Sequence, residues 1–331
     1  MNFAEVSARA QMLRLRQDAF DVLKRYALSV ACIACINHGF NTTFRVDCTD
    51  GQKFALRINV NSPRDLAAIK AEIAWLEALK HDTNLLLPHI VPTRDGAFIL
   101  SYQSATLQRQ THAVLFKWLP GRDIDENATP KQLLEVGRTM AILHQHAKNW
   151  LPPEGCVFPS ARSVFLNSQV VLFDSPMPKT WLETFSTAFA QSEAAHAALY
   201  QRFTPQAIHA DLHLSNVKWF RGHLSVFDFD DSSWGVLPQD LAISTFYLRR
   251  TLGGAVLEAA LLEGYSQVAT LPSYSSAEFE ALIVGRLLVL TNDLLDIENS
   301  ELRGISAKYL ESSQARLQIY LETGVFPPRV L

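Results

Sequence analysis

The sequence contains few cysteines and no long apolar run. Its 331 residues include four cysteines, too few for the disulfide framework of a secreted domain. The amino-terminal stretch mixes charged residues with apolar ones, so it lacks the uninterrupted core of a signal peptide. No segment reaches the roughly 20 apolar residues that a membrane helix requires. We therefore expect a cytoplasmic protein without a membrane partner.

An excess of positive charge is also missing. The chain has 30 Lys and Arg residues against 33 Asp and Glu residues, a formal net charge of -3. Because nucleic acids and anionic membranes attract basic surfaces, we expect neither as a partner, and small molecules are the expected ligands. The 48% of hydrophobic residues suffice for a large buried core. We expect a monomer or a homodimer.

Cys32 and Cys35 form a single Cys-x-x-Cys spacing, which can indicate redox chemistry or half of a zinc site. No second pair of this spacing occurs, and both cysteines lie in the apolar run VACIACI. Free cysteine is among the residues most often buried. We therefore expect packing in a core or a strand rather than chemistry.

The first 120 residues predict an antiparallel sheet with one main helix. Apolar residues recur at helical spacing over about the first thirty residues, which predicts a helix there. The segments IACIN, TFRVDCT and FALRINV, separated by turn signals that include Asp50-Gly51, indicate a meander. A helix is expected from Ser62-Pro63 onward, and further strands at HIVPT, AFILSYQ and HAVLFKW.

Long helical segments dominate from about residue 121. They begin with PKQLLEVGRTMAILHQHAKNW and continue over 176–202, 239–269 and 276–322. The exception is a hairpin in which Arg221-Gly222-His223 joins VKWF to LSVFDF. We find no repeat and no Gly/Ser linker. The pattern predicts two lobes, 1–120 and 121–331, joined by a short hinge.

The segment HADLHLSN, residues 209–216, concentrates chemistry-bearing side chains. The hairpin that follows folds back on itself, so Asn216 and Asp228 should meet at one edge. An amide oxygen and a carboxylate, completed by water and phosphate oxygens, are typical Mg²⁺ ligands at nucleotide-dependent enzymes. Asp211 would then face the phosphate and accept the proton of a hydroxyl group. His209 is expected to brace the loop from a buried position.

Two other interpretations of this segment stay open. His209, Asp211 and His213 could hold zinc or iron for hydrolysis. Such sites recruit further ligands, and the second pair, His144 and His146, stands at i and i+2 of a predicted helix and so points to different faces. Alternatively, the polar side chains only satisfy backbone groups of the loop. The pairing of Asn216 with Asp228 favours phosphoryl transfer over both.

The stretch IHADLHLSNVKW, followed by LSVFDFDDSSWGVLPQDLA, resembles the catalytic segment of the aminoglycoside phosphotransferase and choline kinase family. The motifs NHGFNTTFRV, FALRINV, AEIAWLEAL, VLFKWLPG and GRTMAILHQHA occur in the family's order over roughly residues 30 to 250. The overall pattern is closer to the homoserine kinase and stress-response kinase branch. The resemblance implies an α+β, bilobal, protein-kinase-like fold with ATP and Mg²⁺ as cofactors.

The resemblance also implies a role for individual residues. Asp211 resembles the catalytic base, Asn216 and Asp228 the magnesium ligands, and Asp240 an aspartate that caps the following helix. Arg57 stands where the family contacts the α- and β-phosphates, with Glu72 as its ion-pair partner, although a surface pair is the alternative. The implied nucleotide-binding residues are Gly39, Asn41, Thr42, Arg57, Glu72, Phe116, Lys117 and Leu119. Adenine would meet the backbone of 115–119.

Three positions depart from the family's pattern. Ala210 replaces a glycine, and we expect only a small packing difference. Gly39 is the one glycine of the loop NHGFNTTF, so the Gly-rich signature of protein kinases is absent. Arg57 replaces the lysine of protein kinases, and its planar fork changes the phosphate contact.

The resemblance implies an ATP- and Mg²⁺-dependent phosphotransferase that acts on a hydroxyl group of a small molecule, such as an amino alcohol, an amino acid or an aminoglycoside. A bacterial Ser/Thr protein kinase and a non-catalytic ATP-binding module are the alternatives. The segment 258–303 holds eight acids and two bases. We hypothesise that some of these acids receive a cationic substrate, with a solvated helix face as the alternative. Asp230 and Asp231 are expected to be solvated.

Overall fold

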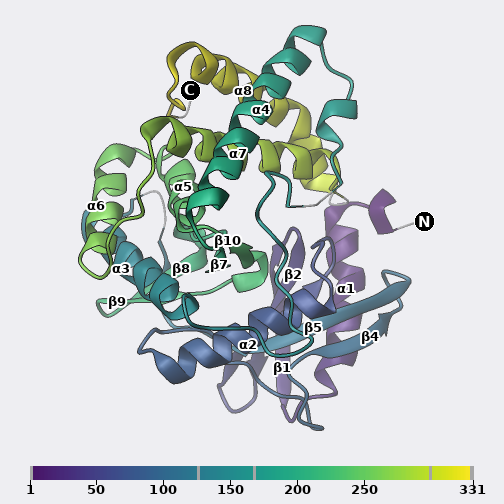
Figure 1. Ribbon diagram of the computed structural model, residues 1–331. Helices are drawn as coiled ribbons and strands as arrows, with labels where there is room; N and C mark the ends of the chain where they lie inside the picture. Colours follow the sequence, from purple (N-terminus) through teal and green to yellow (C-terminus); the bar gives the residue numbers. More distant parts are fainter. Residues whose placement is uncertain (1–2, 125–126, 167–168, 298–299, 329–331) are drawn as a thin grey trace.

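The computed structural model describes residues 3–124, 127–166, 169–297 and 300–328. A sheet-rich part at the amino terminus lies against a larger helical part, which holds the carboxyl terminus (Figure 1). None of the described helices is both long and apolar enough to cross a membrane. The predicted α+β class, with an antiparallel sheet first and helices after it, is confirmed.

The amino-terminal part is built on one five-stranded antiparallel sheet in the order β1-β2-β3-β5-β4. Its elements are η1 (Phe3–Glu5), α1 (Ala8–Leu23), β1 (Val30–His38), β2 (Asn41–Cys48), β3 (Lys53–Asn59), α2 (Leu66–Asp82), β4 (Leu100–Ser104) and β5 (Arg109–Lys117). The predicted meander is confirmed in β1, β2 and β3. The strand predicted at HIVPT is wrong, because Ile90 makes only an isolated bridge to Phe116.

The helix α2 begins later than its start signals suggested. Asp65 caps it by accepting from the backbone N–H of Ala68 at 2.8 Å. Ser62, the expected start, instead donates its hydroxyl to Asp230 at 2.9 Å. A bond between residues so far apart in the chain leaves no trace in the local pattern, and it keeps the segment before α2 extended.

Cys32 and Cys35 lie on β1, the edge strand of the sheet. The expectation of packing in a core or a strand is confirmed as a strand position, in which Cys32 is exposed and Cys35 is half-buried. An edge strand is covered on one side only, so an apolar run does not guarantee burial there.

The carboxyl-terminal part consists mainly of helices. Its elements are β6 (Arg122–Asp123), α3 (Pro130–Ala147), η2 (Leu172–Asp174), α4 (Lys179–Arg202), β7 (Gln206–Ile208), η3 (Leu214–Asn216), β8 (Val217–Phe220), β9 (His223–Val226), η4 (Phe229–Asp231), β10 (Ser233–Gly235), α5 (Leu237–Leu248), α6 (Gly254–Ser266), α7 (Ser276–Leu295) and α8 (Ser300–Thr323). The predicted segments 239–269 and 276–322 are each two helices rather than one. The predicted hairpin is confirmed as β8 and β9.

The connection between the two parts runs from β5 to β6, which pairs with β8. Gly121 lies in this connection with a φ of 114°, and a Cβ there would stand 2.8 Å from the carbonyl oxygen of Trp219. Only glycine fits this close crossing. The lobe boundary near residue 120 stays a prediction.

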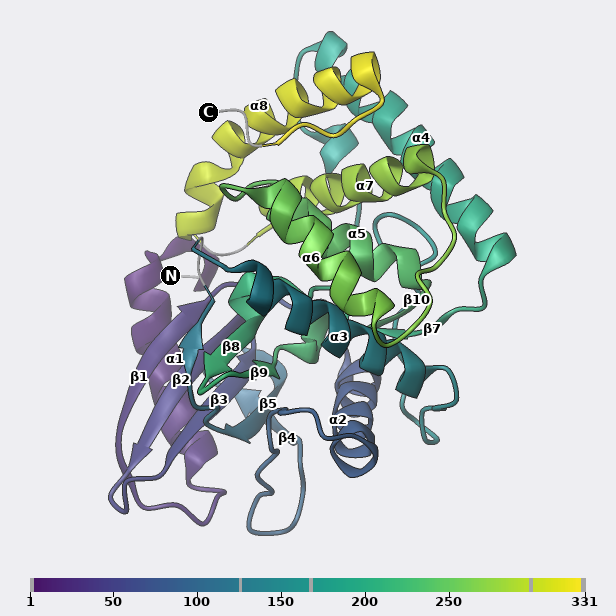
Figure 2. The ribbon, with the colours of Figure 1, turned by 90° about the vertical axis from the view of Figure 1, so that its left-hand side faces the viewer.

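The helix α2 ties the sheet to the helical part. Its Trp75 is fully buried and meets Phe229 edge to face with a centroid distance of 5.6 Å. In two views at right angles, α3 lies between α6 and α2 (Figure 1, Figure 2). The position of α2 therefore fixes the segment around Phe229 relative to the sheet.

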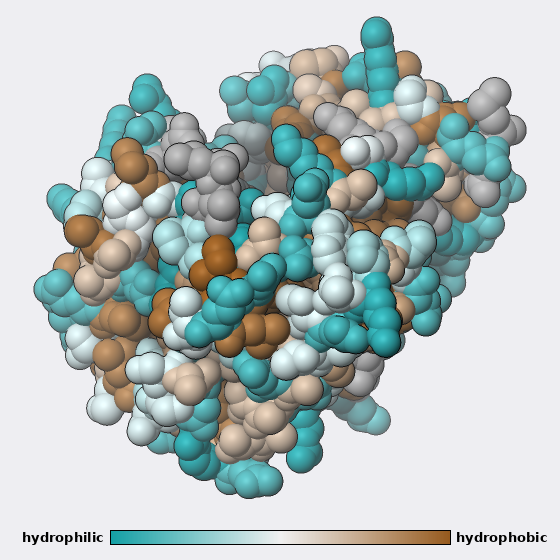
Figure 3. Space-filling view, turned by 90° about the horizontal axis from the view of Figure 1, so that it is seen from above, coloured by the Kyte–Doolittle hydropathy of each residue, from teal (hydrophilic) through white to brown (hydrophobic). Residues whose placement is uncertain are grey.

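Seen from above, hydrophilic side chains cover most of the surface and apolar ones form small groups (Figure 3).

Candidate active site

A buried aspartate on α5, Asp240, binds the backbone of the loop 209–216. Asp240 accepts from the backbone N–H groups of His209 at 2.9 Å and Ala210 at 2.7 Å, and from His144 Nε2 at 3.0 Å. The His144 Nδ1 in turn lies 2.9 Å from the Tyr265 hydroxyl. The expectation that Asp240 caps its own helix is wrong, because α5 begins at Leu237 and Asp240 binds the loop instead.

Ala210 occupies the left-handed region with a φ of 62°. L-residues other than glycine adopt this conformation at a cost of about 1–2 kcal/mol. The replacement of glycine is therefore more than a small packing difference, since backbone strain lies directly before Asp211. The two Asp240 contacts on this segment hold the strained backbone in place.

His209 braces the loop as predicted. Its side chain is buried, Nε2 donates to the carbonyl of Phe227 at 3.2 Å, and Nδ1 accepts from the backbone N–H of Asp211 at 3.3 Å. Burial lowers the pKa of the ring, so the histidine is neutral. Both nitrogens are used within the protein, which makes the hydrolase metal site wrong for His209. Within the described ranges, no three His, Cys, Asp or Glu side chains converge into a metal site of their own.

The hairpin brings Asn216 and Asp228 to one edge. Val217 pairs with Val226, and the N–H of Phe227 donates to the Asn216 carbonyl at 3.0 Å. The Asn216 amide nitrogen donates to Asp211 Oδ2 at 2.9 Å, which turns the amide oxygen to another direction. Burial, together with the Asp230 and Asp211 carboxylates, raises the pKa of Asp228 to about 8, although the Arg57 charge opposes this rise. A cation would relieve this crowding of carboxylates.

Asp230 is not the solvated carboxylate that the sequence suggested. Its Oδ2 accepts from Asn41 Nδ2 at 2.7 Å as well as from Ser62, and its side chain is 10% exposed. Its Oδ1 is buried and has no hydrogen-bond partner in the described structure. Asp231 is more open and pairs with Arg64 Nη2 at 3.3 Å. Because this Oδ1 accepts no hydrogen bond, it suits a hard cation that also takes phosphate and water oxygens.

Arg57 and Glu72 form a buried bidentate pair. The two hydrogen bonds measure 2.8 and 2.5 Å, and the side chains are 9% and 3% exposed. The alternative of a surface pair is therefore wrong. Arg57 Nη1 also lies 3.8 Å from both Asp228 Oδ1 and Asp230 Oδ1. The pair thus fixes one positive charge beside the carboxylates at the hairpin edge.

The remaining predicted nucleotide-binding residues lie around the junction of the two parts. Gly39 is in the short turn between β1 and β2, where its carbonyl accepts from Asn61 at 2.9 Å. Thr42 is fully buried, its hydroxyl lies 2.8 Å from His38 Nδ1, and it pairs with His38 of β1 and Ile58 of β3. Phe116 and Lys117 end β5. The Leu119 backbone makes no hydrogen bond among the described residues, which leaves both polar groups for a ligand.

A cleft of about 710 Å³ lies between the sheet part and the helical part. Its walls include Phe40, Arg64 and His112 from the sheet part, and Asp211, Tyr247 and Arg286 from the helical part. This volume lies in the range of small-molecule sites. The loop 209–216 therefore faces a space large enough for substrates.

Four of the eight acids of the segment 258–303 are already bound by other residues. Glu258 and Glu280 bind Arg249, Glu278 binds Arg202 and Ser275, and Glu263 accepts from Gln267. Glu298 lies outside the described residues. Asp293 and Asp296 line the cleft, and burial raises the pKa of Asp293 to about 6. Among the acids whose side chains the structure describes, which exclude Glu298 and Glu301, the hypothesis of a cation-receiving segment narrows to Asp293 and Asp296.

Sequence reasoning missed several residues of the site. Arg286 and Tyr247 contact Asp211, Arg64 contacts the 230–231 segment, and His144 contacts Asp240. Of these residues, only Arg286 has a local signal in the sequence, because it is one of two basic residues in the acidic segment 258–303. The other contacts join residues distant in the chain.

Comparison with known proteins places the chain among phosphotransferases. Residues 35–277 match the family described as the phosphotransferase enzyme family. No curated protein matches the sequence. A microcompartment-associated aminopropanol kinase superposes with a TM-score of 0.74 at 22% identity, over 94% of this chain and 98% of that one. An amicoumacin kinase complexed with AMP-PNP and Ca²⁺ gives 0.73 at 14% identity, over 91% and 93%. A spectinomycin phosphotransferase with ADP and spectinomycin gives 0.60 at 14%, over 92% and 98%.

Proposed function

The chain belongs to the phosphotransferase enzyme family, and we propose that it transfers the γ-phosphoryl group of ATP, with Mg²⁺, to a hydroxyl group of a small molecule that also carries an amine. The observation that carries this proposal is the position of Asp211. It lines the cleft and accepts a hydrogen bond from Asn216, which the hairpin β8–β9 brings to the same edge as Asp228.

The nucleotide would lie between the two parts. Arg57, kept charged by Glu72 and Asp230 in spite of its burial, would bind the phosphates, and the free backbone groups of Leu119 would bind the adenine edge. Asn216 and Asp228 would hold Mg²⁺, with Asp230 Oδ1 near it. The ion supplies charge neutralisation at the phosphates.

Asp211 would orient the acceptor hydroxyl and take its proton. Burial opposes its ionisation, but His213 and Arg286 hold the pKa of this carboxyl well below its usual range. The group is therefore an anion at neutral pH, which can accept a hydrogen bond from a hydroxyl. Its low basicity favours orientation of the acceptor over early proton removal.

The charge of the cleft favours an amine on the acceptor. Asp293 forms no ion pair within the described structure, yet it lies in the cleft with a raised pKa. An ammonium group would offset the cost of ionising this carboxylate. Two structural neighbours are kinases of an aminopropanol and of amicoumacin. Asp293 follows Arg286 by two helical turns on α7, so the acceptors tested below differ in length.

Thermal denaturation tests the nucleotide site first. A ligand that binds the native state raises Tm by mass action, so ATP should raise it with Mg²⁺ and not with a chelator. Asp228→Ala should remove this shift. ATP without effect, or an equal effect in Asp228→Ala, would contradict the assignment.

A phosphorylation assay then tests the acceptor. Each amino alcohol, from aminopropanol to aminohexanol, is paired with the alcohol that has a methyl group in place of the amine, and aminoglycosides extend the series. We expect turnover only for amines, with a KM that rises in Asp293→Asn. Labelling of protein would instead indicate a protein kinase, and nucleotide binding without any turnover would indicate a non-catalytic module.

A further inference from the structure

Asp211 is held from two sides. Its Oδ2 accepts from Asn216 Nδ2 at 2.9 Å and lies 3.2 Å from His213 Nε2, both on its own loop. Its Oδ1 accepts from Arg286 Nη2 on α7 and from the Tyr247 hydroxyl on α5, the latter at 3.3 Å. The carboxylate is therefore tied to two helices that follow it by 36 and 75 residues in the chain.

Arg286 and Tyr247 form one unit. Arg286 Nη2 donates to the Tyr247 hydroxyl at 2.8 Å, and its guanidinium carbon lies 5.5 Å from the centre of the tyrosine ring. The His213 ring also packs against the Tyr247 ring, at a centroid distance of 4.2 Å. Since the Arg286 side chain is only 9% exposed, its charge needs a fixed anionic partner, and Asp211 is that partner.

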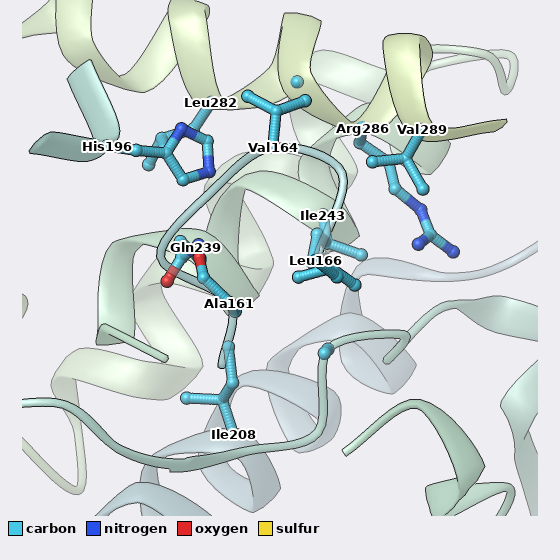
Figure 4. A pocket seen from close by; sticks show the side chains of 12 residues that line it. Ala161, Val164, Leu166, His196, Ile208, Gln239, Ile243, Leu282, Arg286 and Val289 are labelled. Carbon is cyan, nitrogen blue, oxygen red and sulfur yellow. Dashed lines mark hydrogen bonds between the residues drawn. The ribbon is translucent and has the colours of Figure 1, made fainter. Parts of the chain in front are cut away.

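The direction of Arg286 agrees with this role. Its aliphatic part lines a small cavity behind the loop, about 40 Å³ in volume, together with Leu166 and Val289. In the close-up, its guanidinium points away from His196 and Gln239, which also line that cavity (Figure 4). The charged end belongs instead to the cleft that contains Asp211.

We propose that Arg286, with Tyr247, is a positioning residue: it fixes the orientation of the Asp211 carboxylate for the acceptor hydroxyl. The last torsion of an aspartate is broad and poorly defined by itself, so contacts on both oxygens decide where the free lone pairs point. This inference rests on the proposed role of Asp211. It also joins the base to α7, whose Asp293 lies in the same cleft.

Arg249 provides a matched control. It is a partly buried arginine near α7, bound to Glu280 at 2.6 Å and Glu258 at 3.2 Å. It does not line the cleft and touches none of the proposed site residues. Arg249→Met should therefore lower Tm without changing kcat. Arg286→Met keeps the apolar stem at the cavity and removes only the charged end.

The experiment compares kcat, KM and the affinity for Mg·AMP-PNP in the wild type, Arg286→Met, Arg286→Lys, Tyr247→Phe and Asp211→Asn. Turnover is measured with aminopropanol and as Mg·ATP hydrolysis by water. We expect Arg286→Met to lower kcat by about 10- to 100-fold, the effect of one charged hydrogen bond, with both KM and AMP-PNP affinity within twofold. Arg286→Lys should restore part of the loss, and Tyr247→Phe should lower kcat by less.

A crystal structure of Arg286→Met adds a readout that does not depend on turnover. We expect the Asp211 carboxylate to rotate away from its wild-type orientation. A kcat within twofold of the wild type would overturn the proposal. A lower kcat with Asp211 unmoved would also overturn it, because Arg286 would then act on the substrate directly. If Asp211→Asn keeps full turnover, the proposed function fails instead.

Discussion

The buried pair of Arg57 and Glu72 offers a direct test of the structure. Glu72→Ala removes a carboxylate that is 3% exposed and leaves Arg57 without its bidentate partner. Breaking a buried pair by removing one side costs about 3–5 kcal/mol. Asp228 and Asp230, each 3.8 Å from Arg57, offset part of this, so we expect about 3 kcal/mol. Glu72→Gln keeps the volume and one acceptor, and should cost about half as much.

The assay is urea denaturation at neutral pH, with Mg·ATP binding as a second readout. Glu135→Ala is the control, because Glu135 binds Arg138 on the exposed face of α3 with both side chains more than 30% exposed, at 32% and 41%. Exposed pairs contribute about 0–1 kcal/mol. If Glu72→Ala destabilises no more than Glu135→Ala, Arg57 and Glu72 are not a buried pair, and Arg57 is not fixed for a nucleotide.

Three further predictions concern Asp211, Asp293 and the anchor residue Asp240. Asp211→Asn should lower kcat by about 10²–10⁴ while Mg·ATP still binds, and normal turnover would refute its role as the base. Asp293 has a folded pKa of about 6, above that of an unfolded aspartate, so the folded state binds more protons between about pH 4 and 6 and loses stability as pH rises through this window. Asp293→Asn should therefore raise Tm at pH 7 and not at pH 4, and an equal effect at both values would contradict the burial of this carboxylate. Asp240→Ala should destabilise by several kcal/mol, since it leaves the backbone N–H groups of His209 and Ala210 buried without acceptors, and a Tm within 2–3 °C of the wild type would exclude this anchoring role.

Local signals predicted the elements that local interactions determine. The turn at Gly51, with its φ of 82°, and the hairpin around Gly222 lie where the sequence placed them, because glycine is needed for these backbone angles. The helix α3 carries the capping box of Thr129 and Gln132 next to a proline, a start signal that the chain contains in full. The same hairpin brought Asn216 and Asp228 to one edge, and the resemblance to phosphotransferases is confirmed by the family match.

Contacts over long sequence distances account for the errors. Asp230 looked like one of several solvated acids, and only the fold shows that Asn41 and Ser62 reach it from the sheet part. The start of α2 moved for the same reason, since Ser62 is used elsewhere. Asp240 was expected to cap its own helix, but the loop 209–216 offers it two N–H groups and His144 a third donor.

These long-range contacts explain how a loop with a strained residue keeps a single conformation. Ala210 holds a φ of 62° immediately before Asp211, which by itself favours other conformations of the loop. Asp240 fixes the backbone on one side, and Arg286 with Tyr247 fixes the Asp211 side chain on the other. All three anchors come from helices that follow the loop in the chain. The geometry of the proposed base therefore depends on the packing of the helical part, and variants of these helices should change turnover without touching the nucleotide.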